Sequence, residues 1–167
     1  QEIIEFPAVM FDVETKNRVS EFRYFVKPVH CPTLTDFCKN LTGIQQDWVD
    51  GKNLPQNNSA HHGTETLHSD KFPHVLGKFQ EWLLKFNPDL NEILIITCGD
   101  WDLKTMLPAQ CALSGTKVPG HMKRWCNIGA VYCKVHNPKR RGMAGILNDA
   151  NIPLRGKHHS GIDDCRN

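Results

Sequence analysis

The alternation of apolar and polar residues predicts a β-hairpin at the start of the chain. Residues 2–11 form a mostly apolar run, which is typical of a largely buried strand. Residues 19–26 alternate between apolar and polar side chains, which predicts a half-exposed antiparallel partner. A short helix is then predicted over residues 34–41, with Thr35 or Asp36 as its N-cap.

Later in the chain, predicted helices alternate with short strands. Residues 93–98 are wholly apolar, which is typical of a central buried strand, and a further strand is predicted at residues 125–128. Helical periodicity predicts the remaining elements, at residues 75–86, from residue 103 onward with a kink at Pro108, at residues 130–134 and at residues 143–150. This order predicts an α/β domain, in which a mixed sheet carries helices on its faces.

Residues 51–71 lack a hydrophobic period and are rich in Gly, Asn, Ser, His and Thr, which predicts a long mobile loop. Its histidines, His61, His62 and His68, raise the alternative of a metal-binding module. No carboxylate or cysteine stands at ligand spacing beside them, so a polar loop is the favoured interpretation. The length of the chain fits a single domain over residues 1–167.

Composition narrows the class of protein. With 40% hydrophobic and 23% charged residues, and no apolar run of membrane-spanning length, the chain fits a soluble globular domain without a membrane partner. Its seven cysteines are odd in number and never form Cys-x-x-Cys. This usage argues against a disulfide framework or a zinc ribbon, and it favours a reducing compartment, the nucleus or the cytoplasm.

The charged residues are unevenly distributed. Residues 1–100 carry 9 Lys and Arg against 14 Asp and Glu, whereas residues 101–167 carry 11 against 4. The formal charge of +2 therefore hides an acidic first part and a basic second part. A basic half favours a polyanionic partner such as nucleic acid, with a solvated basic face as an equal alternative.

The end of the sequence holds the densest group of chemically useful side chains. Residues 158–164 contain two histidines, a Ser-Gly step and two carboxylates. If a helix begins near Ile162, His159 and Asp164 can face one cleft. A neutral imidazole can take a proton from water and a carboxylate can hold a hard cation, although a solvated polar tail is the alternative interpretation.

Two further carboxylates, Asp100 and Asp102, follow the strand predicted at residues 93–98. Ligands of α/β sheets gather beyond the carboxyl ends of the strands. Asp100 is better explained as the cap of the next helix. Asp102, placed toward Asp164, would complete an oxygen-rich site suited to Mg²⁺ or Mn²⁺.

Four segments, taken in order, resemble a known family. They are Glu2-Ile3-Ile4-Glu5-Phe6-Pro7-Ala8-Val9, Leu41-Thr42-Gly43-Ile44, Trp101-Asp102, and His159 followed five residues later by Asp164. This combination resembles the DEDDh exonucleases, DnaQ-like nucleases with an RNase H-like fold. Within them, the Phe-Pro pair, the aromatic residue before Asp102 and the Gly-Ile-Asp-Asp run make the chain similar to the enhanced-RNA-interference (ERI) 3′-to-5′ exoribonucleases.

The resemblance implies an RNase H-like mixed sheet flanked by helices, and hydrolysis of single-stranded RNA or RNA 3′ ends with two Mg²⁺ (or Mn²⁺) ions. Asp102 and Asp164 match two of the family's acidic metal ligands, and His159 matches its general base. His158 fails the five-residue offset and is left out.

The resemblance also implies contacts to the substrate. Trp101 and Leu41 match positions that contact the terminal base, with an ordinary core role as the alternative. Lys139, Arg140 and Arg141 form a basic run that would contact phosphates in a nuclease and in a binding module alike.

One departure from the family concerns its first motif, an Asp-x-Glu that precedes the Glu-Ile-Ile-Glu strand. Here Asp12 and Glu14 follow that strand, so we do not assign them as the catalytic pair. We therefore expect a partial domain, incomplete at both ends, with its first strand and last helix missing, and nearly inactive alone. The alternative function is a non-catalytic RNA- or protein-binding relative, and the sequence names no protein partner.

Overall fold

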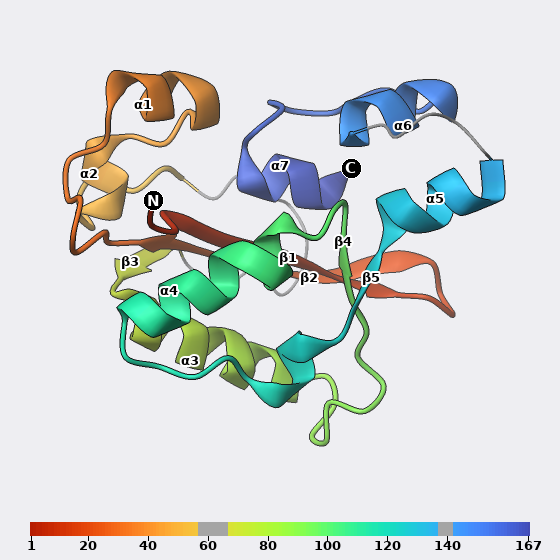
Figure 1. Cartoon of the computed structure of the whole chain (residues 1–167), viewed down its shortest axis with the longest axis horizontal. Coiled ribbons are helices and arrows are strands. Elements are labelled where there is room, and N and C mark those ends of the chain that lie inside the picture. Colours follow the sequence, from red (N-terminus) through yellow and green to blue (C-terminus); the bar gives the residue numbers. More distant parts are fainter. Residues whose placement is uncertain (57–66, 137–141) are drawn as a thin grey trace. The chain divides into compact units, whose positions relative to one another are not determined.

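The computed structural model describes three stretches of the chain, residues 1–56, 67–136 and 142–167. They fall into two compact units: unit 1 comprises residues 1–80 and 155–167, and unit 2 comprises residues 81–154. Each unit has its own small sheet and its own helices (Figure 1). None of the helices in the described stretches is both long enough and apolar enough to span a bilayer. The single domain predicted over residues 1–167 stays a prediction.

Unit 1 is built on a three-stranded sheet in the order β1-β2-β3. Its elements are β1 (Glu5–Asp12), β2 (Asn17–Val26), α1 (Asp36–Thr42), α2 (Gln46–Val49), β3 (His68–Asp70), most of α3 (Phe72–Leu84) and α7 (Gly161–Arg166). The predicted hairpin is confirmed, because β1 and β2 pair in antiparallel fashion. The loop predicted over residues 51–71 is wrong at its end, since residues 68–70 pair with β2 in parallel. The buried side chain of Leu67 anchors this strand.

The turn of the hairpin is closed by a side chain. Asp12 Oδ1 accepts hydrogen bonds from the backbone N–H groups of Glu14, at 2.8 Å, and Thr15, at 3.2 Å. The N–H groups of Thr15 and Glu14 hold the pKa of Asp12 below its ordinary value. Asp12 therefore has a local structural role, as expected for an aspartate that nucleates a turn.

Strand β2 is buried on both faces from Ser20 onward, so the half-exposed strand predicted at residues 19–26 is wrong in its burial. On one face, Phe22 packs against Phe79 of α3, with ring centroids 5.3 Å apart. Adjacent side chains of a strand point to opposite faces, and Glu21 on the other face binds Arg166 of α7. The two helices thus lie on opposite sides of the hairpin (Figure 1).

A second apolar cluster surrounds Phe25 near the end of β2. It consists of Phe25, Leu34, Ile44 and Val49, contributed by β2, the segment before α1, the segment after it and α2. Helix α1 begins where predicted, because the side chain of Thr35 accepts a hydrogen bond from Cys38 N at 3.2 Å. It ends at Gly43, whose left-handed φ of 82° is the usual helix stop.

Unit 2 holds a two-stranded parallel sheet of β4 and β5. Its elements are the end of α3, β4 (Ile95–Thr97), the π-helix η1 (Trp101–Met106), α4 (Leu107–Leu113), the 3₁₀-helix η2 (Gly120–Lys123), β5 (Trp125–Asn127), α5 (Ile128–His136) and α6 (Met143–Asp149). The central buried strand predicted at residues 93–98 is wrong in its burial, since Ile96 is 54% exposed. Within the described residues β4 pairs with β5 alone, which leaves it at a sheet edge.

The kink predicted at Pro108 takes the form of a change of helix type. Pro108 has no N–H to donate, so it is tolerated only in the first turn of a helix, where it lies in α4. The preceding turn is widened, and Leu107 N donates to Asp102 O, five residues back. Short π-helical turns of this kind are frequent at functional sites.

Candidate active site

Helix α7 presents the candidate site. The chain turns at His159, whose φ of 71° lies in the left-handed region, and Ser160 occupies the N-cap position. Asp164 N donates to Ser160 O at 2.8 Å, which closes the first turn. The helix predicted to begin near Ile162 is therefore confirmed, and Asp164 lies in its first turn, beside His159.

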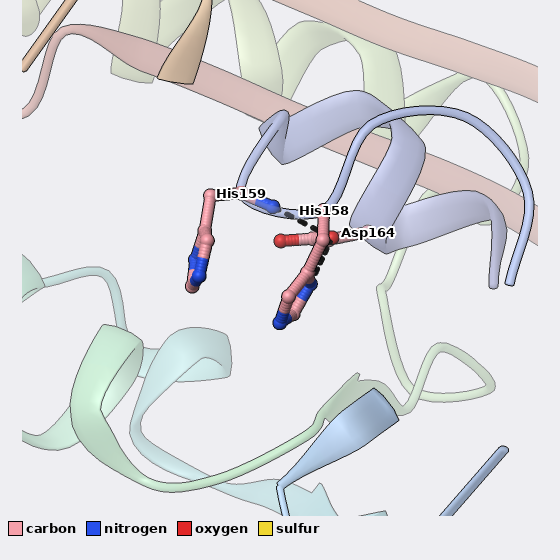
Figure 2. A group of neighbouring side chains, drawn as sticks. All are labelled: His158, His159 and Asp164. Atoms are coloured by element: carbon pink, nitrogen blue, oxygen red, sulfur yellow. Dashed lines mark hydrogen bonds and ion pairs between the residues drawn. The ribbon is translucent and has the colours of Figure 1, made fainter. Parts of the chain in front are cut away.

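Three side chains come together at this turn (Figure 2). Asp164 Oδ1 lies 3.3 Å from His158 Nδ1 and accepts a hydrogen bond from the backbone N–H of His159 at 3.3 Å. The two imidazoles are stacked, with centroids 4.0 Å apart and planes inclined by 27°. One potential ligand atom from each residue lies within 4.8 Å of the others. In the described part of the chain, this is the one group of three His, Cys, Asp or Glu residues close enough to share a metal ion.

The start of α7 is tied to β1 by a buried carboxylate. Glu5 Oε2 accepts a hydrogen bond from Gly161 N at 3.0 Å, while Glu5 Oε1 accepts one from Arg23 Nε at 2.7 Å. A Cβ atom at Gly161 would lie 2.6 Å from Glu5 Oε2 and 2.8 Å from Pro7 Cγ. Only glycine therefore fits at the first residue of α7 without moving β1 or its salt bridge.

The end of α7 is tied to β2 by a second buried carboxylate. Arg166 donates to both oxygens of Glu21, from Nε at 2.9 Å and from Nη2 at 2.6 Å. Glu21 is 3% exposed, and the hydrogen bond to it raises the pKa of Arg166 above its ordinary value. We name Glu5 and Glu21 the carboxylate clamp, because they hold the two ends of α7 on the hairpin.

The loop before α7 is also fixed. Lys157 N donates to Asp163 Oδ2 at 3.0 Å, and Lys157 Nζ donates to Asn40 O at the end of α1, at 2.9 Å. Arg155 and Asn167 exchange two hydrogen bonds of 2.8 Å. The two histidines thus stand between anchored segments of unit 1.

The other predicted metal ligand, Asp102, lies in η1 of unit 2, where its side chain is exposed and has no hydrogen-bond partner among the described residues. Its approach to Asp164 of unit 1 stays a prediction. Asp100 does take the N-cap position of η1, but its side chain makes no capping hydrogen bond. Instead Asp100 Oδ1 accepts a hydrogen bond from Trp125 Nε1 at 3.0 Å, which corrects its predicted capping role.

The predicted substrate contacts are surface residues. Trp101 is 60% exposed on η1 and Leu41 is 38% exposed on α1, so neither is a core residue. The basic run of Lys139, Arg140 and Arg141 lies outside the described residues.

Of the three histidines predicted to lie in the loop, the structure describes one. His61 and His62 also lie outside the described residues, whereas His68 belongs to β3 and lies 5.3 Å from the ring of Tyr24.

Sequence reasoning missed three residues that shape the site. The five-residue spacing of the family selects His159 and leaves out His158, yet the ring of His158 is the one that pairs with Asp164. The sequence predicts no role for Glu5 or Glu21 at the site, although each binds an arginine and holds one end of α7 on the hairpin. Glu5 lies between Ile4 and Phe6, and this is an available signal, because a carboxylate flanked by apolar residues in a strand is buried only when it is paired. Glu21 follows Ser20 and carries no such signal.

The chain belongs to the exonuclease family RNase_T, whose profile matches residues 1–167. Within this family it is similar to the ERI1 exoribonucleases. It is 38% identical over 172 residues to ERI1 exoribonuclease 3 of Bos taurus and of Homo sapiens, covering 100% of this chain and 45% of each relative. The chain thus spans less than half the length of these relatives.

Solved structures agree with this assignment. The nuclease domain of 3′hExo, a DEDDh family member bound to rAMP, matches 99% of this chain and 76% of that domain, with 32% identity and a TM-score of 0.83. A 3′-exonuclease solved in a study of histone mRNA stem-loop recognition matches 99% of this chain and 67% of its own, with 30% identity and a TM-score of 0.79. The predicted family and the predicted α/β fold class are therefore confirmed.

Proposed function

We propose that this chain is the nuclease domain of a 3′-to-5′ exoribonuclease that shortens single-stranded RNA or RNA 3′ ends. The observation that carries the proposal is the placement of His159 and Asp164 at one turn, in a member of the exonuclease family. A base and a metal-binding carboxylate that share one small volume suit phosphodiester hydrolysis, and here a ring nitrogen of His159 and an oxygen of Asp164 lie within 4.8 Å of each other.

The available carboxylates fit divalent cations. Asp164 uses Oδ1 for its two contacts, and its Oδ2 makes no hydrogen bond among the described residues. Asp102 carries an exposed carboxylate with the same freedom. Carboxylate oxygens suit Mg²⁺ or Mn²⁺, so we assign these two aspartates as ligands.

Each protein group has a separate task in the proposed reaction. The imidazole of His159 takes a proton from the attacking water, and the N–H of the same residue holds Asp164 in place. Two bound ions would supply activation of that water and stabilisation of the leaving 3′ oxygen. The two-metal arrangement also needs a bridging carboxylate, so we expect Asp102 and Asp164 alone to support weak ion binding and little hydrolysis.

Substrate contacts complete the proposal. The exposed indole of Trp101 offers a flat surface for stacking on a base, and Leu41 offers an apolar edge. The basic run of residues 139–141 would contact phosphates, without selecting a sequence.

The test measures shortening of single-stranded RNA, labelled at its 5′ end, by this chain and by a version extended at its N-terminus with a strand that carries an Asp-x-Glu motif, in Mg²⁺ with EDTA controls. We expect stepwise shortening by the extended version, and a loss of about 10²–10⁴-fold for its His159→Ala variant. His74→Ala is the matched control, since His74 is also exposed and also lies beside a carboxylate, Asp70.

Two results would contradict the proposal. Full activity of the His159→Ala variant would remove the assigned base. RNA binding without any shortening, by both proteins, would favour the non-catalytic binding relative instead.

A further inference from the structure

His158 is the member of the site that the proposed reaction leaves unused. Its Nδ1 lies 3.3 Å from Asp164 Oδ1, and its ring stacks on that of His159. The turn therefore presents two imidazole nitrogens and a carboxylate oxygen to one small volume. Figure 2 shows the two rings and the carboxylate projecting from the same turn.

This donor set suits a different cation from the one that the proposed nuclease needs. Mg²⁺ is held by oxygen ligands, whereas two histidines and one carboxylate are a familiar set for Zn²⁺ and its neighbours in the first transition row. We infer that His158, His159 and Asp164 form a binding site for a Zn²⁺-class ion, in which His159 is one of the three protein ligands.

The distances are close to those that such an ion requires. Ligand atoms bound at ~2.0–2.1 Å to a tetrahedral ion lie roughly 3.4 Å apart. The atoms of His158 and Asp164 are already 3.3 Å apart, and one atom from each of the three residues lies within 4.8 Å of the others. The rings of His158 and His159 are stacked, and the lone pairs of ring nitrogens lie in the ring planes, so closing the site needs these exposed rings to turn until their lone pairs converge, with no movement of α7.

The surroundings of the two imidazole rings allow them to turn while Asp164 stays in place. The ring of His159 makes no hydrogen bond among the described residues, so turning it breaks none. Asp164 is fixed in the first turn of α7, and the carboxylate clamp holds both ends of that helix. A rigid carboxylate with two adjustable imidazoles leaves a fourth position open to water.

The consequence for activity rests on the proposed function. A Zn²⁺-class ion would occupy the lone pair of His159 with which the proposed base accepts its proton. It would also draw Asp164 away from Mg²⁺. Such an ion would therefore inhibit the nuclease in competition with Mg²⁺.

The test is calorimetric titration of the chain with Zn²⁺, and separately with Mg²⁺, with the histidine side-chain ¹⁵N shifts recorded in parallel. We expect Zn²⁺ binding that shifts the ring nitrogens of His158 and His159. We also expect an affinity reduced about tenfold or more in each of His158→Gln, His159→Gln and Asp164→Asn, because losing a ligand costs at least as much as losing its outer partner. His74→Gln is the matched control and should bind Zn²⁺ as the unchanged chain does.

Other outcomes would overturn the inference. One is Zn²⁺ affinity that is unchanged by His158→Gln, and another is affinity that is lost on replacing His61 and His62, which would assign the ion to the histidine-rich segment. Because binding is measured without RNA, failure of the nuclease assay would leave this result intact. Retained nuclease activity without Zn²⁺ binding would remove the ion site and keep the proposed function.

Discussion

Replacement of Gly161 by alanine tests how the candidate site is held on the hairpin. Alanine has the higher helix propensity, which by itself predicts a gain of about 0.5–1 kcal/mol. The added Cβ would instead lie 2.6 Å from Glu5 Oε2 and 2.8 Å from Pro7 Cγ. Glu5 cannot move away without weakening its 2.7 Å salt bridge to Arg23. Helix propensity therefore predicts that the substitution raises the free energy of unfolding, whereas packing predicts that it lowers it.

The packing effect should be the larger one. Overpacking costs about 1–3 kcal/mol. Loss of the hydrogen bond from Gly161 N to the Glu5 carboxylate adds about 1.5–3 kcal/mol. After the gain in propensity, we expect the Gly161→Ala variant to lose about 1.5–5.5 kcal/mol in its free energy of unfolding. For a chain of 167 residues this corresponds to a fall in Tm on the order of 10 °C.

The measurement is urea unfolding followed by circular dichroism, with Gly77→Ala as the control. Gly77 lies inside α3, and a Cβ atom there would meet nothing within 4 Å. We expect this control to gain about 0.5–1 kcal/mol, as propensity alone predicts. If Gly161→Ala is as stable as the control, the contact between Glu5 and α7 does not hold the site and the reasoning fails.

Three further predictions concern the rest of the chain. The Arg166→Met variant leaves Glu21, which is 3% exposed, without its bidentate partner. Urea unfolding should show a loss of about 2–4 kcal/mol in the free energy of unfolding, and an unchanged midpoint would contradict the role of the carboxylate clamp. Thr35→Ala removes the N-cap of α1 and should cost about 1 kcal/mol in the same assay, with Thr35→Ser nearly neutral. Burial lowers the pKa of His121 below its ordinary value of 6.5, so the unfolded chain binds more protons than the folded chain between the two pKa values. Stability contributed by His121 is therefore present above about pH 6.5 and falls as the pH drops toward the pKa of the folded chain. Thermal melts across this pH range should show a smaller dependence of Tm on pH in the His121→Leu variant, and an unchanged dependence would contradict the role of His121.

The elements that the sequence predicts well depend on neighbours along the chain. The hairpin follows from alternation on either side of a turn, and α1 from a Thr35 cap and a Gly43 stop. The start of α7 follows from a Ser-Gly step before an acidic first turn. Each of these signals lies within a few residues of the structure that it determines, so it can be read without knowing the rest of the fold.

The elements that the sequence predicts poorly depend on distant partners. Strand β3 is three residues long and exists because residues 68–70 pair with β2, more than forty positions earlier. The burial of β2 depends on α3 covering one face and α7 the other. His158 is a further case, because a spacing rule selects one histidine, whereas the geometry of the turn brings two to Asp164.

The six residues of α7 are too few to form a stable helix on their own, since isolated helices need about 12–15 residues to be even marginally stable. Its position must therefore come from its contacts with the rest of unit 1, which are the burial of Ile162 and the carboxylate clamp that binds its first and last residues to β1 and β2. Buried charges contribute little net stability when replaced together, but they fix geometry because an unpaired one is costly. We conclude that Glu5 and Glu21 set the direction in which His159 and Asp164 point. It follows that hairpin mutations that displace Glu5 or Glu21 should alter the positions of His159 and Asp164 through α7.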